Sequence, residues 1–541
     1  MFWNYIKIAI RNLRKHKSFA AVNIFGLAIG LTTYVFGGLL VRYEETHDAF
    51  FENSANIYTI GAIAAPDLGM GFSSLNSIFT AAGPLLDAEI EDIELMARTV
   101  ALEYLLSVGS EGFYQTLLFA DSAILQIFDF DYIHGDQTAL ESPNSVLMSE
   151  TAAIKYFGNT DVVGQIITLD NEHEFFVSAV IRDVPANSHF NSMIILETKF
   201  DVIAPLAVLS KMRDFDLAGE WDNLSLGNMT YVLLPPQLDG TWLEAQMEGV
   251  FDRHASEDTR KIISSMTATP LIHANLSIWD NFGMPMVTIV KLLSFLVLLV
   301  ACVNYTNLAT AQSLGRSREV GMRKTMGAEP RQLLTQFLVE SMVIASIAMI
   351  ITLATLEIII PLFNASTGKI MSLNYFRTMP WLIGTTLFVG LLAGLYPAWL
   401  ITRTNPIDAL RDIARKGKSG SATRSFMIGA QFAISAFMLA LVAIVYMQNE
   451  KVKESSYVFP RSEIYTLERL NIDTIRERLD TLRVELENLP NISSVSYSSQ
   501  VPYEQNNSTR SVARNQGDKA GEIQMHIMRM TPEFLKTYNI P

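Results

Sequence analysis

The stretch VTIVKLLSFLVLLVACVNYTNLATA, from Val287 to Ala311, decides the fold class of this chain. Its only charged residue is Lys291, close to its beginning. About 20 predominantly apolar residues suffice for a helix to cross the hydrocarbon core of a bilayer. Four further windows have the same character, namely Ser18–Val41, Leu333–Ile360, Trp381–Thr402 and Phe426–Met447. The sequence therefore predicts an α-helical transmembrane protein with five crossings.

The long segment after the first crossing has mixed polarity and predicts a large α+β extracytoplasmic domain, inserted from residue 42 to 286. Ser149 is expected to cap a helix over Ser149–Tyr156, and a second helix is expected over Phe251–Ser265. Runs rich in Val, Ile and Phe predict strands, with a turn at Asp170 and Asn171 in one hairpin. The strands are expected at Asn144–Met148, Gln165–Leu169 and Glu174–Arg182.

The region after the fifth crossing repeats this pattern and predicts a partial second copy of the outer domain. Strands are expected at Ile464–Leu467 and Ile492–Tyr497, and a helix at Ile475–Leu486. The expected order of segments is a basic cytoplasmic segment (1–17), the first crossing (18–41), the outer domain (42–286), crossings two to four (287–402), a cytoplasmic linker (403–425), the fifth crossing (426–447) and the incomplete second domain (448–541). We expect the chain to be a fragment of a longer permease with more helices.

The distribution of Lys and Arg predicts the orientation in the membrane. Five basic residues precede the first crossing, and further basic clusters follow the second and the fourth. This pattern predicts a cytoplasmic N-terminus and outer domains on the opposite side. The net charge of −14 gives no support to nucleic-acid binding.

Catalytic and metal-binding patterns are missing from the sequence. Cys302 is the single cysteine, and His173-Glu174 has no second histidine at the spacing of a zinc protease. Gly417-Lys418-Ser419 resembles the end of a phosphate-binding loop, but Asp412 stands where that loop needs a glycine. We therefore expect no catalytic residue, no metal and no cofactor in this chain, and interpret this segment as a basic linker.

Few ionisable residues lie inside the apolar windows, which argues against an ion-coupled transport path. Lys291, Glu340 and Glu357 all fall near helix ends, where partners or the interface can accommodate them. The most informative segment is REVGMRKTMGAEPRQLL, from Arg318 to Leu334, between the second and third crossings. It predicts a short helix that ends near Gly327 and is followed by a new helix at Pro330. Its mixture of charged, small and apolar residues suits docking in a groove of a partner protein.

Several spaced motifs resemble permeases of the MacB/FtsX/LolC type, the mechanotransmission class of ABC transporters. They are RNLRKHKSFAAVNIFGLAIGL (Arg11–Leu31), SVLMSETAAIKYFG (Ser145–Gly158), FVSAVIRDVPANSHF (Phe176–Phe190), NYTNLATAQSLGRSREVGMRKTMGA (Asn304–Ala328), FLVES (Phe337–Ser341) and GLYPAWLITRTNPIDALR (Gly394–Arg411). The resemblance implies a coupling helix that docks on a nucleotide-binding subunit through Arg318, Glu319, Gly321, Arg323, Lys324 and Gly327. It implies a second cytoplasmic contact at Asn405, Pro406 and Ala409.

The resemblance also implies a partner and a location for the chain. Because no Walker motif is present, a separate cytoplasmic ATPase would bind ATP and Mg, and the first helix would relay its motion to the outer domain. We expect the bacterial inner membrane, a dimeric or pseudo-dimeric permease, contact with membrane lipid and a possible periplasmic adaptor. Lipoproteins, peptides, macrolide-like drugs and toxins stay open as substrates. The alternatives are a regulator that activates a periplasmic enzyme, a transmembrane ligand receptor and a membrane enzyme.

Overall fold

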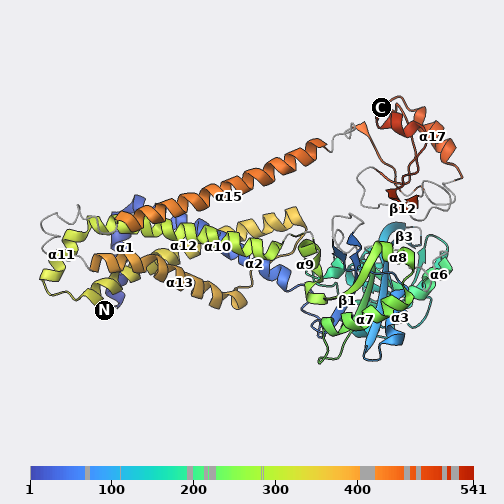
Figure 1. The fold of residues 1–541 in the computed structure, drawn as a ribbon, viewed down its shortest axis with the longest axis horizontal. Coiled ribbons are helices and arrows are strands. Elements are labelled where there is room, and N and C mark those ends of the chain that lie inside the picture. The colour runs from blue at the N-terminus through green and yellow to red at the C-terminus, as the bar shows by residue number, and fades with distance from the viewer. Residues whose placement is uncertain are drawn as a thin grey trace. The chain divides into compact units, whose positions relative to one another are not determined.

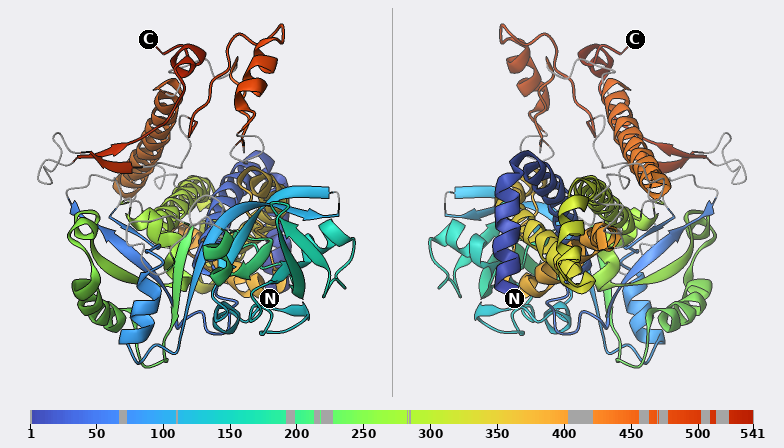
Figure 2. Two further views of the ribbon diagram at one scale, coloured as in Figure 1. Left: turned by 90° about the vertical axis from the view of Figure 1, so that its right-hand side faces the viewer. Right: turned by 90° about the vertical axis from the view of Figure 1, so that its left-hand side faces the viewer.

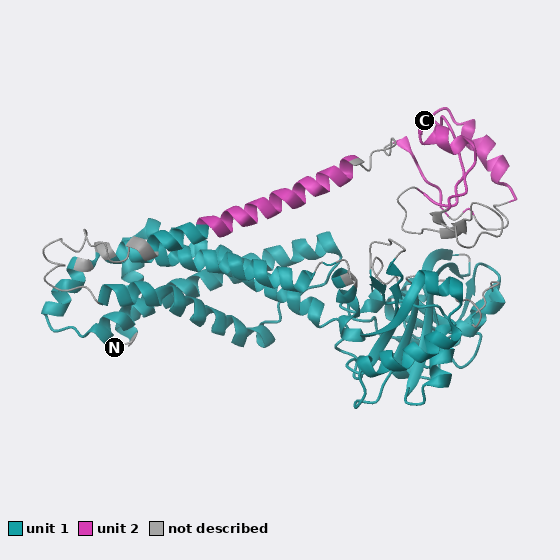
Figure 3. Ribbon diagram, viewed as in Figure 1, with its two compact units in different colours: residues 1–431 teal, residues 432–541 magenta. Residues whose placement is uncertain are grey.

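A computed structural model covers the chain. The chain folds into two compact units. The units are residues 1–431 and 432–541, coloured separately in Figure 3. The structure describes residues 2–66, 73–109, 111–191, 199–212, 217, 227–281, 283, 285–402, 421–455, 463–468, 470, 477–501, 509–512 and 523–540.

Five helices in the described residues are long and apolar enough to cross a membrane. Each predicted window lies inside one of them (Figure 1). They are α2 (Lys17–Glu45), α10 (Met286–Gly315), α12 (Pro330–Thr367), α13 (Tyr375–Thr402) and α15 (Ser421–Ser455). The helices are longer than the windows because helical structure continues past the last apolar residue into polar ends. The structure also adds a helix that the sequence analysis missed, α1 (Phe2–Lys15), within the expected basic segment.

Glycines allow helix α2 to approach α10 closely. A Cβ atom added at Gly30 would lie 2.4 Å from the Cβ of Ala301, and one at Gly37 would lie 1.9 Å from the Oγ of Ser294. Small residues at such contacts let helix backbones meet in a membrane, where packing rather than the hydrophobic effect drives association. Leu31 and Val35, fully buried, belong to the core shared by α2, α10, α12 and α13.

The outer domain is built on one eleven-stranded mixed sheet within the described residues. Its main path runs β11-β1-β10-β3-β4-β9-β6-β8-β5, with β2 paired to β1, and β7 paired to β3 and β8. The strands are β1 (Ile57–Ala64), β2 (Ser74–Leu75), β3 (Leu95–Val108), β4 (Glu111–Ala120), β5 (Tyr132–His134), β6 (Ser145–Ser149), β7 (Ile166–Leu169), β8 (His173–Ile181), β9 (Val202–Pro205), β10 (Asn228–Leu233) and β11 (Ile263–Pro270). The pairs β4–β9 and β6–β8 are parallel, and the others are antiparallel.

Short helices cover this sheet (Figure 2). They are α3 (Ala82–Glu89), α4 (Ile124–Ile127), α5 (Glu150–Phe157), α6 (Leu209–Met212), α7 (Gly240–His254), α8 (Glu257–Ile262) and α9 (Leu271–Asn281). Apolar clusters form between the sheet and these helices. The α+β prediction for this domain is confirmed.

Local predictions around α5 agree with the structure. The Oγ of Ser149 accepts a hydrogen bond from the amide of Ala152 at 3.1 Å, as an N-cap does. Asp170 and Asn171 adopt positive φ angles of 50° and 60° in the turn between β7 and β8. Strands β6, β7 and β8 lie within one residue of the predicted bounds.

The predicted helix at Phe251–Ser265 is wrong in its extent. Helix α7 ends at His254, and Ser256 caps the separate helix α8 through the amide of Thr259. Strand β11 then begins at Ile263, because antiparallel pairing with β1 satisfies its backbone. A capping serine and a long-range strand partner therefore override the local helical pattern.

The unit of residues 432–541 contains most of α15 and a small C-terminal region. Its further elements are α17 (Leu479–Glu487), β12 (Thr509–Val512), β13 (Ile523–His526) and α18 (Glu533–Thr537). Helix α17 overlaps the predicted helix Ile475–Leu486, of which residues 475 and 476 lie outside the described residues. The strand predictions at Ile464–Leu467 and Ile492–Tyr497 are wrong, because both described segments are irregular. The described part of this region shows no second copy of the eleven-stranded sheet.

Replacing Gly37 by Ala should destabilise the helical bundle, because the new methyl group would overlap Ser294. Overpacking of this kind typically costs about 1–3 kcal/mol. Thermal unfolding of the detergent-purified protein measures the loss. Gly384→Ala in α13 is the matched control, because a Cβ there meets no atom within 4 Å. Equal midpoints for the two variants would contradict the close packing of α2 on α10.

Candidate functional site

The segment singled out by the sequence forms a short helix at the end of the bundle far from the sheet (Figure 1). Helix α11 (Ser317–Thr325) lies between α10 and α12. Gly327 follows it with φ of 91°, a left-handed conformation that favours glycine, and Pro330 begins α12. The predicted end of the short helix and the predicted start of the next are confirmed.

One side of α11 is packed against the spanning helices. Val320 is buried in a small cluster with Leu333 of α12 and Ile401 of α13, and Gly321 beside it is buried as well. The packing fixes α11 to two transmembrane helices at once.

A network of charged groups fixes the start of α11. The guanidinium of Arg316 lies 3.2 Å from Glu340 of α12 and 3.8 Å from Glu319. It also lies over the ring of Phe337, 5.0 Å from the centroid. Arg316 and Glu340 are mostly buried, so breaking this pair would leave an uncompensated buried charge. The pair therefore fixes the start of α11 on α12 more firmly than an exposed ion pair would. Glu340 is thus explained by a partner at the helix end, as its position in the sequence suggested.

The end of α11 is tied down by two further cations. Arg323 lies 2.6 Å from Glu319 one turn earlier and donates to the Oε1 of Gln336 at 2.9 Å. Lys324 donates to the carbonyl of Thr402 at 2.7 Å, which joins α11 to the end of α13. Partial burial lowers the pKa of Lys324 from its ordinary value. Arg323 and Lys324, two of the three predicted docking cations, therefore also hold the helix in place.

The opposite side of α11 faces outward. Arg318 is exposed, Met322 is 48% exposed and Met326 just after the helix is 85% exposed. These positions recur every four residues and therefore share one face of a helix. A cation beside two flexible thioether side chains makes an adaptable surface for a protein partner. Gly327, also exposed, borders this face.

The predicted docking residues thus divide into two groups. Arg318 and Gly327 lie on the outward side, whereas Gly321 is buried, and Glu319, Arg323 and Lys324 take part in bonds that position the helix. Asn405, Pro406 and Ala409, the predicted second contact, lie outside the described residues, as do Gly417, Lys418 and Ser419.

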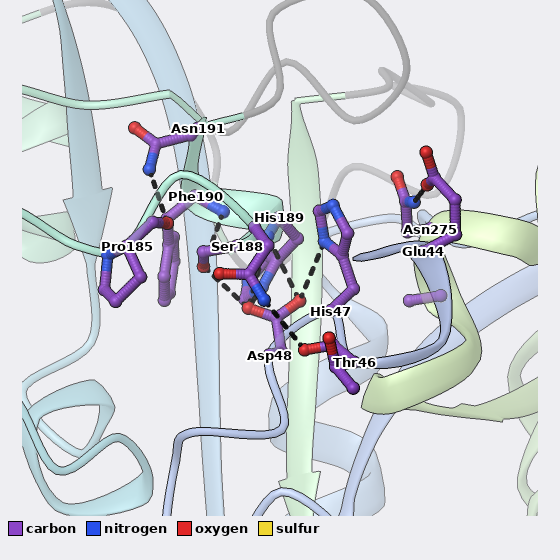
Figure 4. A network of polar contacts seen from close by, with 12 residues as sticks. Glu44, Thr46, His47, Asp48, Pro185, Ser188, His189, Phe190, Asn191 and Asn275 are labelled. Atoms are coloured by element: carbon purple, nitrogen blue, oxygen red, sulfur yellow. Dashed lines mark hydrogen bonds and ion pairs between the residues drawn. The ribbon is translucent and has the colours of Figure 1, made fainter. Parts of the chain in front are cut away.

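The other end of α2 enters a polar joint with the outer domain (Figure 4). Asp48, three residues after the helix, is fully buried, and its Oδ1 accepts from the hydroxyl of Ser188 at 2.6 Å. The Nδ1 of His189 lies 2.9 Å from the same oxygen, and its Nε2 lies 2.9 Å from the hydroxyl of Tyr231 in β10. Burial alone would raise the pKa of Asp48, but the His189 charge and the hydrogen bonds outweigh it and hold that pKa below its usual range.

Hydrogen bonds to backbone carbonyls reinforce the joint between α2 and the outer domain. The side-chain amide of Asn187 donates to the carbonyl of Thr46 at 3.0 Å, and the amide of Asp48 donates to the carbonyl of Asn187 at 3.0 Å. Tyr43 in the last turns of α2 donates to the carbonyl of Ala186 at 3.1 Å. Asp48 adopts a left-handed φ of 56°, which these bonds stabilise. The end of α2 and the loop after β8 are therefore joined by several bonds.

Two carboxylates at the last turn of α2 connect it to other elements. Glu44 accepts from Asn275 of α9 at 2.7 Å and from Lys369, after α12, at 2.5 Å. Glu45 pairs with Lys291 of α10 at 2.5 Å. Lys291, one of the few charges in the apolar windows, thus has a partner at the helix end.

Sequence reasoning missed this joint. The segment Phe176–Phe190 resembles a family motif, but its sequence assigns no structural role to Ser188 or His189, and no local pattern marks Asp48. The available signal was the run Asn187-Ser188-His189 between apolar residues, since buried polar side chains need partners. Finding Asp48 as that partner requires the tertiary structure, because 140 positions separate Asp48 from Ser188.

Acidification should weaken the joint through Asp48. A carboxyl whose pKa is depressed on folding stabilises the protein above its unfolded pKa of about 4, and this stability is lost as pH falls through the folded pKa. Asp48→Asn should therefore destabilise the outer domain by about 3–5 kcal/mol at neutral pH, with a smaller difference from the unmodified protein in acid. Denaturant unfolding at pH 7 and below pH 4 tests this.

The matched control for that experiment is Asp131→Asn, because Asp131 pairs with Arg182 at the surface, with both side chains mostly exposed. It should change stability little at either pH. A destabilisation by Asp48→Asn no larger than that of the control would contradict the role assigned to the buried carboxylate.

Comparison with known proteins places the helical region in a family. The model for the FtsX-like permease C-terminal family matches residues 291–406, which contain most of α10 and all of α11, α12 and α13. The chain is 19% identical over 424 residues to the macrolide export ATP-binding/permease protein MacB of Campylobacter fetus, covering 76% of this chain and 61% of MacB. It is 28% identical over 283 residues to YknZ of Bacillus subtilis, an uncharacterized ABC transporter permease, covering 52% of this chain and 64% of YknZ.

Solved structures of two domains are similar to part of this chain. A domain of a putative permease from Porphyromonas gingivalis matches with 22% identity and a TM-score of 0.34, covering 41% of this chain and 91% of that domain. The periplasmic region of MacB from Actinobacillus actinomycetemcomitans matches with 14% identity and a TM-score of 0.31, covering 42% of this chain and 94% of that region.

The chain spans about three fifths of the length of the first two curated relatives that it matches. Its described residues hold five helices long and apolar enough to span a membrane, with a large α+β domain between the first and second of them. Residues 291–406 match the FtsX-like permease C-terminal family, and the chain is similar over longer stretches to the ABC transporter permeases MacB and YknZ.

Proposed function

We propose that this chain is a permease subunit that couples ATP hydrolysis by a separate cytoplasmic ATPase to movement of its outer domain. The observation that carries the proposal is the outward face of α11, formed by Arg318, Met322 and Met326 on a helix fixed to α12 and α13. A docking helix must be rigid on its inner side and open on its outer side. Helix α11 meets both conditions.

Docking at α11 would move the spanning helices because side chains on the inner side of α11 are bonded to two of them. Arg316 connects its start to α12, and Lys324 connects its end to the last residue of α13. A displacement of α11 by a partner would therefore act on two helices together. Arg316 and Lys324 are already engaged in these bonds within the chain. The partner would therefore contact the face formed by Arg318, Met322 and Met326.

Transmission to the outer domain would use α2. Its 29 residues, at about 1.5 Å per residue, give a rod of about 43 Å, enough to cross a bilayer. It is packed on α10 through Gly30 and Gly37 and is bonded at its far end to the Ser188–His189 loop. A continuous helix that is packed on the bundle and bonded to the outer domain transmits displacement better than a flexible linker does.

The rest of the proposal follows the family. ATP and Mg would be bound by the partner ATPase, and Asn405, Pro406 and Ala409 would form the second cytoplasmic contact. The basic ends favour a cytoplasmic N-terminus and an outer domain in the periplasm of a bacterial inner-membrane protein. A dimeric or pseudo-dimeric permease would present its outer domains to a substrate or a periplasmic adaptor, for export or extraction.

Reversing the charge of Arg318 should strongly weaken capture of the ATPase. The tagged full-length chain is purified from its own host's membranes in mild detergent, and co-purifying proteins are identified by mass spectrometry. We expect a Walker-motif ATPase with the unmodified chain and at least about a tenfold loss with Arg318→Glu, since truncation of a contact hot spot costs about 2 kcal/mol or more. Arg182→Glu, which reverses an exposed charge on the outer domain, should leave capture unchanged.

Recovery of a periplasmic enzyme or a signalling protein in place of an ATPase would overturn the proposal. It would favour the regulator or the receptor among the alternatives. Equal ATPase capture by Arg318→Glu and the unmodified chain would instead place the docking surface elsewhere.

A second variant separates binding from coupling. Arg323→Glu breaks the bonds to Glu319 and Gln336 that hold α11, while the Arg318 face stays outward. We expect the captured ATPase to be retained, and its rate to lose its dependence on the permease. The readout is the ATPase rate of the purified complex against that of the ATPase alone. A permease-dependent rate equal to that of the native complex would contradict the positioning role of Arg323.

A further inference from the structure

Helix α1 has a face that the rest of the described chain leaves uncovered. Trp3 is 66% exposed and Ile10 is 43% exposed, and Lys7, Arg11 and Arg14 are exposed between them. Positions 3, 7, 10, 11 and 14 follow the three- and four-residue spacing of one helix face. A tryptophan, an isoleucine and three cations thus share a single surface.

The other face of α1 is packed on the bundle. Ala9 is 1% exposed, and Leu13 contacts the core shared by the spanning helices. The side-chain amide of Asn12 donates to the Oε2 of Glu340 in α12 at 3.4 Å. These contacts fix which side of the helix is turned outward.

The position of α1 places this surface at the membrane boundary. His16 alone separates α1 from the spanning helix α2. In the right-hand view of Figure 2, which looks along the bundle, α1 is seen lengthwise at one edge of the bundle. Its axis therefore runs along the bilayer surface at the end of the bundle that carries α11.

From this arrangement we infer that the outward face of α1 is a binding site for the headgroups of anionic phospholipids. A helix with cations and a tryptophan on one face is suited to the interface, where the ring enters the acyl boundary and the cations meet lipid phosphates. Helix α1 contains Lys7, Arg11, Arg14 and Lys15 and no acidic residue. Within the described residues, the structure pairs none of these four cations with a carboxylate.

Charge explains the selectivity for anionic over zwitterionic lipid. Each Lys or Arg near an anionic surface strengthens attraction several-fold, and the effect falls off within a Debye length. Trp3 and Ile10 contribute apolar contact that does not depend on the headgroup. The site thus combines general attachment to the interface with a preference for negative lipid.

The test uses the full-length chain reconstituted in vesicles with brominated phosphatidylglycerol or brominated phosphatidylcholine at equal mole fraction. Bromine quenches nearby tryptophan, and the difference between the unmodified chain and Trp3→Phe isolates the signal of Trp3. We expect phosphatidylglycerol to be preferred by at least about tenfold, and the preference to fall toward one in 1 M NaCl.

The triple variant Lys7→Gln, Arg11→Gln, Arg14→Gln should lose the preference while Trp3 is still quenched by both lipids. Its control is Arg182→Gln, Lys211→Gln, Arg260→Gln, which removes three exposed cations from the outer domain. Thermal unfolding shows whether each variant is folded. Equal quenching by the two lipids in the unmodified chain, or a preference kept by the triple variant, would overturn the inference. Absence of quenching of Trp3 would show that this face does not meet the bilayer.

Discussion

The close approach of α2 to α10 is the constraint on which the rest of this structure depends. No side chain larger than hydrogen fits at Gly30 and Gly37 without moving Ala301 or Ser294. This contact fixes the helix that links the bundle to the outer domain. Because α2 is continuous from Lys17 to Glu45, its orientation in the bundle also determines where the outer domain is attached.

The attachment is polar where the bundle packing is apolar. A buried carboxylate is costly unless it is paired, and Asp48 meets the imidazole and the backbone amide of His189 and the hydroxyl of Ser188. Such a cluster has one favourable geometry, since any displacement leaves a buried charge unsatisfied. The outer domain is therefore held to α2 by direction-dependent bonds, which suits transmission of a movement.

At the end of the bundle that carries α11, a buried carboxylate is likewise held by several partners. Glu340 accepts from Asn12 of α1 and from Arg316 at the start of α11. One carboxylate in α12 thereby joins α1 and the proposed docking helix α11. Glu340 and Lys291, two of the few charged residues in the apolar windows, are thus points where separate elements are connected.

The sequence by itself determined the spanning helices, the α+β class of the outer domain and the short helix before Pro330, because apolar runs, capping residues and glycine turns act locally. Ser149 could be recognised as a cap because its partner, Ala152, lies three residues away. Tertiary structure alone decided that Asp48 meets His189, that Val320 is buried while Met322 is exposed, and that β11 replaces the expected end of a helix. Those outcomes depend on partners far away in the sequence, and local propensity carries no information about them.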